Sequence, residues 1–486
     1  MNAVRWKAMV RECLLCLSRL ASRAVAALLL LCAAFGWQQV NESAGEPARE
    51  FRAAWVATVF NLDWPSRSGL SAAQQRAELV QILNQAARLK LNAIILQVRP
   101  NSDALYKSPH EPWSGWLSGP GTDPGYDPLA FAVTEAHSRG IELHAWFNPF
   151  RATIIDKPVG RGHISARHPE LIKTAGKITL LNPSRAESQQ HVLKVILDVV
   201  RRYDIDGVHL DDYFYPYPPN HNIADGLRPA QRRAAIDAFV QRLYAEVKRA
   251  KPWVRVGISP FGVWRPGTPA GVQAGVDAYE HLACDARKWL ASGWVDYLAP
   301  QLYWPCEGPQ SFPALMRWWS SVNPARPVWP GISTANLGRK INHAEIGRQL
   351  DYARSLARQS SGHLFWSWKS IGTNRGGIQA ELAARYNGFA VPPAMPWCGS
   401  ARPGRPVAQA QNSPRGTSIS WAPADSSARK WVIQARRAGR WTSLCILPGT
   451  QRSVTLPPRM FEGVDRIAVR PISACGNSGV PAVLAR

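Results

Sequence analysis

The chain is poor in acidic residues and carries few charges overall. Its 486 residues include 34 Asp and Glu against 58 Lys and Arg, and charged residues make up 19% of the total against 46% apolar residues. This composition excludes an intrinsically disordered, collagen-like or coiled-coil chain. With 21 tryptophans, we expect a folded, aromatic-rich protein. The length suits about three domains, or one large domain with a small companion.

Sequence signatures of nucleic-acid and metal binding are missing. The chain has no block of five or more Lys and Arg, no zinc-finger spacing and no RNP motif, so its net charge of +24 indicates an anionic surface or polymer as partner and no nucleic acid. After residue 36 it has neither a CxxC nor an HExxH spacing. We therefore expect no metal site, and no cofactor is required.

No apolar run is long enough for a typical membrane-spanning helix. The run over residues 24–35 falls short of the roughly 20 residues needed, and basic residues precede it while the small residues Ala34 and Gly36 follow. Residues 1–36 are therefore predicted to be a signal peptide that exports the protein to the periplasm or cell envelope. The alternative contacts with the membrane are an uncleaved signal or an outer-membrane lipoprotein anchor at Cys32.

Five cysteines follow the predicted signal. In an oxidising compartment we expect Cys284 to pair with Cys306 and Cys445 with Cys475, which leaves Cys398 unpaired.

Short β-branched runs alternate with helical patterns over residues 49–390. One helical pattern places Leu79, Ile82, Leu83 and Ala86 on a single face. Eight strand-then-helix units predict an α/β fold, a (β/α)8 TIM barrel with enlarged loops. An open doubly wound sheet is disfavoured because no Gly-rich phosphate loop follows an early strand. The predicted strands are residues 51–59, 93–98, 141–147, 207–211, 254–259, 296–303, 328–333 and 363–367.

Beyond the barrel the composition changes twice. Residues 391–406 are rich in Pro and Gly and predict a linker. Residues 407–486 show the alternation of short antiparallel strands and predict a small all-β sandwich domain. Because every candidate catalytic group precedes residue 391, we expect residues 1 to about 400 to suffice for activity.

Two adjacent carboxylates end the fourth predicted strand. Reacting groups of a (β/α)8 barrel come from the carboxyl ends of its strands. Asp211 and Asp212 would point to opposite sides of a regular strand, so they share a cleft only if the strand ends there. Their repulsion would raise one pKa and leave the other group ionised, as acid/base chemistry at an acetal requires. The structural alternative is that one of the two aspartates caps a loop and the other pairs with a nearby arginine. Asp206, at the start of the strand, is expected to have a structural role.

Other strand ends place polar groups beside aromatic rings. Apolar sugar faces stack on rings while hydroxyls take hydrogen bonds, so together these ends predict a polysaccharide site. Taken singly, each aromatic residue can equally be a core residue instead of a sugar contact. His144 can equally be a hydrogen-bonded core residue. The candidate substrate-binding residues are Asp63, Trp64, Gln97, Arg99, Asp103, His144, Trp146, Asn148, Arg151, His209, Tyr213, Gln301, Tyr303, Trp304 and Trp366. Arg99 and Arg151 are candidates to receive a substrate carboxylate or to organise neighbouring aspartates.

Ordered segments resemble the glycosyl-hydrolase-like family 10 proteins of bacterial envelopes. They are FRAAWVAT (51–58), LQVRPNSDALY (96–106), GYDPL (125–129), ELHAWFNPFR (142–151), DGVHLDDY (206–213) and APQLYW (299–304). The resemblance implies a glycosidase-type barrel, exported or lipid-anchored, that acts on peptidoglycan glycan strands, notably peptide-free ones. The C-terminal segment is similar to fibronectin type III-like modules.

The fourth strand also resembles amylase and chitinase signatures. Asp211 matches the amylase nucleophile, but Tyr213 stands where chitinases have a catalytic Glu. The general acid is therefore Asp212 or, second, Glu307 after the sixth strand. We expect an exported glycoside hydrolase that cleaves β-1,4 bonds of N-acetylated glycan strands, with peptide-free peptidoglycan as its substrate. The alternatives are a hydrolase of another envelope polysaccharide and a catalytically silent glycan-binding protein.

Overall fold

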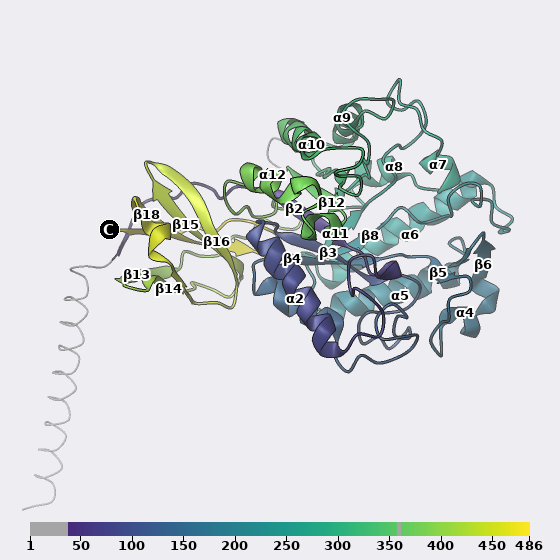
Figure 1. Cartoon of the computed structure of the whole chain (residues 1–486), viewed down its shortest axis with the longest axis horizontal. Coiled ribbons are helices and arrows are strands. Elements are labelled where there is room, and N and C mark those ends of the chain that lie inside the picture. Colours follow the sequence, from purple (N-terminus) through teal and green to yellow (C-terminus); the bar gives the residue numbers. More distant parts are fainter. Residues whose placement is uncertain (1–36, 357–360) are drawn as a thin grey trace, which may run out of the picture.

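The structure contains a parallel sheet of eight strands that closes into a barrel (Figure 1). The computed structural model describes residues 37–356 and 361–486, so the predicted signal and Cys32 lie outside the described residues. The barrel strands in chain order are β2 (Phe51–Val56), β3 (Ala93–Arg99), β4 (Glu142–Phe147), β8 (Gly207–Leu210), β9 (Arg255–Ile258), β10 (Tyr297–Leu298), β11 (Gly331–Ser333) and β12 (Gly362–Trp366). Each predicted strand segment contributes one of them, which confirms the (β/α)8 fold.

Closure of the barrel takes place between β10 and β11. The hydrogen-bonded order runs from β10 through β9, β8, β4, β3, β2 and β12 to β11, and parallel bridges join Leu298 to Val328 and Gln301 to Gly331. The ladder of β10 is shorter than the sequence predicts because Pro300, which has no backbone N–H to donate, lies two residues beyond Leu298. The chain beyond Leu298 therefore becomes a loop at the carboxyl end of the barrel.

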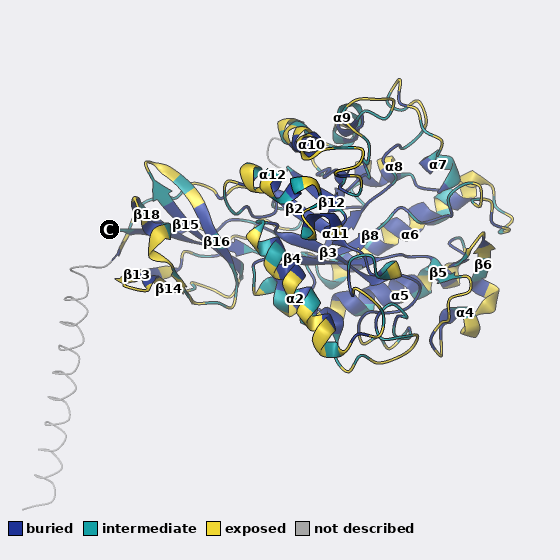
Figure 2. Ribbon diagram, in the orientation of Figure 1, coloured by how far each residue is buried: buried dark blue, intermediate teal, exposed yellow. Residues whose placement is uncertain are grey.

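Helices cover the outside of the barrel. In α2, Ser71 accepts a hydrogen bond from the backbone N–H of Gln74 in a capping box, and the predicted apolar face, with Leu79 and Leu83, is buried (Figure 2). No helix in the described ranges combines the length and hydropathy needed to cross a membrane. The longer helices are α2 (Ala72–Arg88), α3 (Pro128–His137), α5 (Ala186–Arg202), α6 (Pro229–Ala250), α9 (Phe312–Val322), α10 (His343–Leu356) and α12 (Ile378–Arg385), and the shorter ones are α4 (Ile164–Arg167), α7 (Ala278–His281), α8 (Ala286–Ala291) and α11 (Trp368–Gly372).

The loop after β4 is enlarged into a small antiparallel sheet. Its strands are β5 (Arg151–Ile154), β6 (Ile172–Ala175) and β7 (Ile178–Leu181), in the order β5, β7, β6. Because it follows a barrel strand, this sheet lies on the carboxyl face, where a barrel carries its reacting groups.

Two antiparallel sheets form the C-terminal sandwich. Trp421 and Trp431 pack against each other in its core. One sheet has the order β13, β14, β17 and the other β1, β19, β18, β15, β16. Their bounds are β13 (Val407–Ser413), β14 (Gly416–Ala422), β15 (Ala428–Arg437), β16 (Arg440–Pro448), β17 (Ser453–Leu456), β18 (Val464–Ser473) and β19 (Ala482–Ala485).

The edge strand β1 (Gln38–Val40) comes from the other end of the chain. It pairs antiparallel with β19, Gln38 lying opposite Ala485, and Trp37 is buried in the sandwich core. The sequence does not predict this strand because three residues are too few to show a period-2 pattern. The first residues after the predicted signal thus complete a domain built mainly from the C-terminus.

The predicted disulfide pairing is wrong. Cys398 is bonded to Cys475, with 5.8 Å between their Cα atoms, while Cys284, Cys306 and Cys445 are free. The expected pairs followed the order of the cysteines along the chain. The fold instead places Cys398, which follows the barrel, against Cys475 in the turn after β18. Bridging is decided by the distance between Cα atoms, not by chain order.

The predicted linker is held along its length. The backbone N–H of Val391 donates to Ala48 O at 2.9 Å, and the indole N–H of Trp397 donates to Asp296 at 2.6 Å. Together with the disulfide of Cys398, these contacts fix the sandwich against the barrel.

Candidate active site

Asp211 and Asp212 lie in one cavity at the carboxyl ends of the barrel strands. Its volume is about 280 Å³. Because β8 ends at Leu210, both aspartates belong to the loop, which is the condition under which they share a cleft. The cavity is lined by Trp55, Trp146, Asp211, Asp212, Ser259, Gln301, Tyr303 and Trp366.

Six of these eight residues are predicted site residues, and Trp55 and Ser259 are not. Ser259 directly follows β9, so the strand-end rule that selects Asp211 would have selected it too. Trp55 lies inside β2, where an apolar residue is expected in the core and gives no signal of its own. The rings of Trp55 and Trp146 both meet the ring of Trp366 edge-on, with centroids 6.2 and 6.0 Å away.

Burial raises the pKa of both aspartates. The pKa of Asp211 rises to about 6, because burial outweighs the attraction of Arg151, and the pKa of Asp212 rises to about 7, because the charge of Asp211 adds to burial. Near neutral pH one carboxyl group of the pair is therefore ionised while a large fraction of the other is protonated. This division suits a glycosidic acid and its anionic partner.

Two buried amides set the orientation of Asp211. The Oε1 of Gln97 accepts the backbone N–H groups of Thr58 at 2.8 Å and Val59 at 2.9 Å, so its Nε2 faces Asn148 and donates to Oδ1 at 2.6 Å. The Nδ2 of Asn148 must then face Asp211, to which it donates. Both predicted substrate residues therefore act on Asp211 rather than line the cavity.

A tyrosine hydroxyl binds the carboxyl group of Asp212. Its Oδ2 accepts the hydroxyl of Tyr217, which leaves Oδ1 to carry a proton. Tyr213 directly follows the pair and donates its backbone N–H to Asp211 Oδ1 at 3.3 Å. The guanidinium of Arg151 lies 5.9 Å from the Tyr213 ring centroid.

The carboxylate of Asp63 connects the loops after the first and last barrel strands through hydrogen bonds. Its carboxylate accepts the backbone N–H groups of Ala57 at 2.8 Å and Lys369 at 2.7 Å and the hydroxyl of Ser367 at 2.8 Å. Burial raises its pKa to about 6. Asp63 therefore organises the barrel rim and does not line the catalytic cavity.

Arg99 and Trp64 lie in the core, which corrects their assignment as sugar contacts. The fully buried guanidinium of Arg99 donates two hydrogen bonds to the carboxylate of Glu111, of 2.8 and 2.6 Å. It also donates to the carbonyl oxygens of Asn148 and Pro149. No donor of Arg99 remains for a substrate carboxylate. The indole of Trp64 is buried and donates to Gln75 O at 2.9 Å.

Glu307 and Trp304 lie outside the cavity. The Glu307 side chain is 83% exposed and pairs with Arg348 at 2.9 Å. An exposed carboxylate that does not line the cavity of Asp211 and Asp212 is poorly placed to be the general acid. Trp304 packs edge-to-face on Phe261 at 5.6 Å.

A directed chain of hydrogen bonds runs from Trp55 through the barrel core. The indole N–H of Trp55 can only donate, and it lies 3.1 Å from Nε2 of His209, which therefore accepts. Nδ1 of His209 then carries the proton and donates to the Tyr297 hydroxyl at 2.9 Å. That hydroxyl donates to Nδ1 of His144 at 3.0 Å, and Nε2 of His144 faces Glu142 at 3.3 Å. His144 and His209, predicted as sugar contacts, are fully buried core residues, and burial lowers the pKa of His209 well below its usual value.

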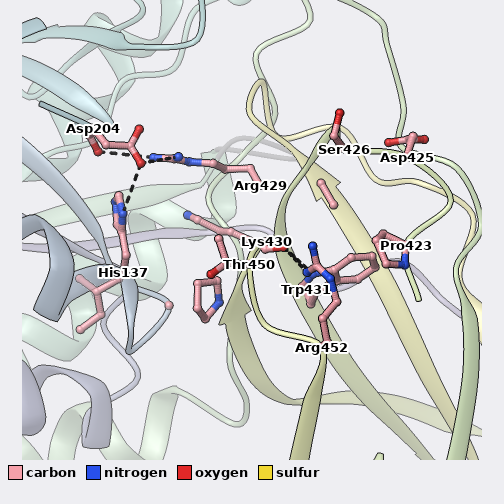
Figure 3. A pocket seen from close by; sticks show the side chains of 15 residues that line it. His137, Asp204, Pro423, Asp425, Ser426, Arg429, Lys430, Trp431, Thr450 and Arg452 are labelled. Carbon is pink, nitrogen blue, oxygen red and sulfur yellow. Dashed lines mark hydrogen bonds and ion pairs between the residues drawn. The ribbon is translucent and has the colours of Figure 1, made fainter. Parts of the chain in front are cut away.

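The chain ends at the seam between barrel and sandwich. Lys430 of β15 donates to Glu142 at 2.8 Å, and Glu142 is the first residue of β4, at the opposite end from the cavity. Beside it Arg429 reaches from the sandwich to Asp204 on the barrel at 2.6 Å, with His137 on the same carboxylate (Figure 3). A hollow of about 300 Å³ opens at this seam. Asp206 pairs with His137 at 2.7 Å, the structural role expected for it.

In the part of the chain that the structure describes, no three His, Cys, Asp or Glu side chains are grouped to hold a metal ion.

Comparison with known proteins identifies the family to which the chain belongs. The family model described as Glycosyl hydrolase-like 10 matches residues 50–223 and 217–354. The glycosyl hydrolase YngK of Bacillus subtilis (strain 168) is 37% identical over 390 residues, which cover 74% of this chain and 76% of YngK. The glycosyl hydrolase DigH of Escherichia coli (strain K12) is 33% identical over 366 residues, 66% of this chain and 83% of DigH.

Among solved structures, the PgaB (BpsB) glycoside hydrolase domain from Bordetella bronchiseptica aligns with a TM-score of 0.47 and 14% identity, over 71% of this chain and 99% of that domain. The family match and the two relatives, more than 30% identical over most of their own length, decide the assignment. The chain is a glycoside hydrolase and belongs to the glycosyl hydrolase-like 10 family.

Proposed function

We propose that the protein hydrolyses the β-1,4 bonds of N-acetylated glycan strands and that peptide-free peptidoglycan is its substrate. The observation that carries the proposal is the pair Asp211 and Asp212, with unequal raised pKa values, in a cavity walled by three tryptophans. Rings stack on sugar faces, and a paired acid and anion are the groups that glycosidic cleavage needs.

Asp212 is the general acid in this proposal. Its proton passes to the glycosidic oxygen as the bond from that oxygen to the anomeric carbon breaks, so the leaving sugar departs as a neutral alcohol. The negative charge of Asp211 stabilises the oxocarbenium-like centre, either as nucleophile or by orienting the substrate acetamido group. Asp212 then recovers a proton from the water that attacks the anomeric carbon.

Gln301 and Tyr303 line the same cavity and offer an amide and a hydroxyl to sugar hydroxyls. Arg151, the remaining strand-end arginine, acts electrostatically on Asp211 and Asp212. Its charge and the net charge of +24 favour an anionic polymer such as a strand that keeps the lactyl carboxylates of muramic acid. We place the enzyme in the periplasm or cell envelope on the basis of the export signal predicted over residues 1–36.

The test is mass spectrometry of the products released by the chain lacking residues 1–36. The substrates are peptide-free peptidoglycan, peptide-bearing peptidoglycan and chitin oligomers. Release of oligosaccharides from the peptide-free strands supports the proposal. Cleavage of another envelope polysaccharide alone would overturn it, and binding of strands without any product would indicate a catalytically silent glycan-binding protein.

A further inference from the structure

The C-terminal sandwich is strongly basic. Residues 407–486 contain eleven Lys and Arg but only three Asp and Glu, a larger excess for their length than the barrel carries. Several of these cations lie on the turns and the chain terminus at one end of the sandwich, which we call the basic end. Its members are Arg415, Arg437, Arg440, Arg459 and Arg486.

The turn between β13 and β14 lies beside the short helix η4 (Pro458–Phe461). Arg415 stands in this turn, and Thr417, two residues further on, pairs with Leu456, two residues before η4 begins. Arg459 belongs to η4 itself. Both arginines are exposed, so both charges lie on the surface at this end of the sheet.

The turn between β15 and β16 reaches the same helix. The guanidinium of Arg437 donates to the carbonyl oxygens of Met460 and Glu462, the latter at 3.0 Å. Arg440 pairs with Arg437 across this turn and is exposed. The second hairpin therefore adds its charge to those of the first turn and of η4.

Strands β18 and β19 bring the C-terminus to this end as well. Arg466 of β18 pairs with Arg436, directly before Arg437, on one side and with Ala485 on the other. Arg486 follows Ala485 and is exposed. The terminal guanidinium therefore lies at the end of the sandwich where the other turns meet.

Three cations of the basic end have no anion to neutralise them. The side chains of Arg415, Arg440 and Arg459 form no hydrogen bond or ion pair with another described residue. The nearby acidic residues Asp465 and Glu42 are paired with other arginines. Exposed, unpaired arginines on separate turns create a positive potential that suits an extended anionic surface rather than one small ligand.

The two ends of the described chain meet at the basic end. Gln38 pairs with Ala485, and the guanidinium of Arg486 lies 5.8 Å from the ring centroid of Trp37. Figure 1 shows the C-terminus at the end of the sandwich that points away from the barrel. Residues 1–36, with their apolar run and basic residues, join the fold at Trp37. Any contact of this segment with a membrane therefore brings the basic end to the lipid surface.

We propose that the basic end of the sandwich is a docking surface for a membrane of anionic phospholipids. The guanidinium groups bind headgroup phosphates, for which the planar fork of arginine is suited. This surface does not depend on which glycan the active site cleaves.

Docking at the basic end sets the direction of the active site. Glu142, the first residue of β4, contacts Lys430 of the sandwich, so the base of the barrel faces the sandwich. The cavity of Asp211 and Asp212 lies at the carboxyl ends of the barrel strands, on the opposite face. A protein bound through the basic end therefore opens its catalytic cavity away from the lipid.

Attraction to the membrane is electrostatic. Among the described residues, the exposed large apolar side chains lie elsewhere: Phe60, Ile155 and Val159 on the barrel, and Val407 and Val480 at the opposite end of the sandwich. Each arginine near an anionic surface adds roughly fivefold to the affinity, and salt screens this attraction.

The first experiment measures co-sedimentation of the chain lacking residues 1–36 with lipid vesicles. This chain contains both domains, and the deletion removes the apolar run that could enter the lipid by itself. The vesicles consist of phosphatidylglycerol and phosphatidylcholine in equal parts, or of phosphatidylcholine alone. We expect binding to the anionic vesicles only, and its loss at high salt. A chain that binds both kinds of vesicle equally, or neither, overturns the proposal.

The second experiment compares two triple variants on the anionic vesicles, with circular dichroism as the folding check. The test variant neutralises the unpaired arginines of the basic end: Arg415→Gln, Arg440→Gln and Arg459→Gln. The control removes the same charge from exposed positions on α2, α5 and α6: Arg88→Gln, Arg201→Gln and Arg242→Gln. We expect the test variant to bind on the order of 100-fold more weakly and the control to stay within about twofold of the parent. Equal losses would show attraction by net charge alone and overturn the docking surface.

Hydrogen exchange of the parent tests the orientation without any substitution. The vesicles should slow exchange at residues 415–416, 438–440 and 459–461 and leave the catalytic loop 211–217 unchanged. Protection of the catalytic loop instead overturns the orientation. Binding of peptide-free glycan strands through the same arginines, without binding to vesicles, would identify an anionic polymer as the partner and overturn the membrane proposal.

Discussion

Lys430 of the sandwich and Glu142 of the barrel form an ion pair of 2.8 Å in which each side chain is about one-tenth exposed. Arg255 is the other cation near Glu142, at 3.6 Å. The sandwich therefore supplies the closer of two cations that act on a carboxylate at the base of β4. The expectation that residues 1 to about 400 suffice for activity stays a prediction. A fragment of this length keeps Glu142 without Lys430 and Cys398 without Cys475, so its stability has to be measured together with its activity.

We expect Lys430→Met to destabilise the protein by about 1 to 3 kcal/mol, because the buried Glu142 loses its hydrogen-bonded cation and keeps only Arg255, at 3.6 Å. The control is Arg185→Gln, which removes the exposed ion pair with Glu187 and should cost about 1 kcal/mol or less. Urea denaturation followed by tryptophan fluorescence measures both. Equal effects of the two variants would show that the Lys430 pair contributes no more than a surface contact.

Asp211→Asn should reduce kcat by about 10³-fold or more while leaving the fold intact. The change keeps the shape of the side chain and removes the charge that the cationic transition state needs. Steady-state kinetics with circular dichroism as the folding check measures it. Turnover close to that of the parent in a folded variant would remove Asp211 from the mechanism.

The pH dependence of kcat/KM should be bell-shaped with a narrow optimum between about 6 and 7. Activity falls below the range because Asp211, with a pKa of about 6, takes up a proton and loses its charge. Activity falls above the range because Asp212, with a pKa of about 7, loses the proton it must donate. A profile that is flat between pH 5 and 9 would contradict the assignment of the pair.

Tyr297→Phe should interrupt the hydrogen-bond chain at its centre. The change leaves Nδ1 of both His144 and His209 without a partner, and we expect a loss of about 1 to 3 kcal/mol of stability. Nitrogen-15 NMR of labelled histidines should show Nδ1 protonated in His209 and Nε2 protonated in His144 of the parent. The control is Tyr352→Phe, whose hydroxyl contacts Arg317 near the surface. The opposite tautomers in the parent would refute the direction of the chain.

Local sequence pattern was sufficient to predict the barrel and much of the cavity. A buried parallel strand is a short β-branched run, and the residue after it lies on the carboxyl face, whatever the rest of the chain does. This is why the aspartate pair after β8, and Gln301 and Tyr303 after β10, could be placed from the sequence. Trp366 is the last residue of β12, and Trp146, one residue before the end of β4, was selected together with the polar residues that follow it.

Only the tertiary structure decided which partner each polar side chain meets. Arg99 and Arg151 each follow or end a barrel strand and are equivalent in the sequence. In the structure the loop residue Glu111 accepts hydrogen bonds from Arg99, whereas the charge of Arg151 acts on Asp211. Cys398 meets Cys475 and Gln38 meets Ala485 across most of the chain. Periodicity and propensity act over a few residues, whereas the pairing of charges, sulfurs and edge strands depends on how distant segments pack, and no local pattern encodes that distance.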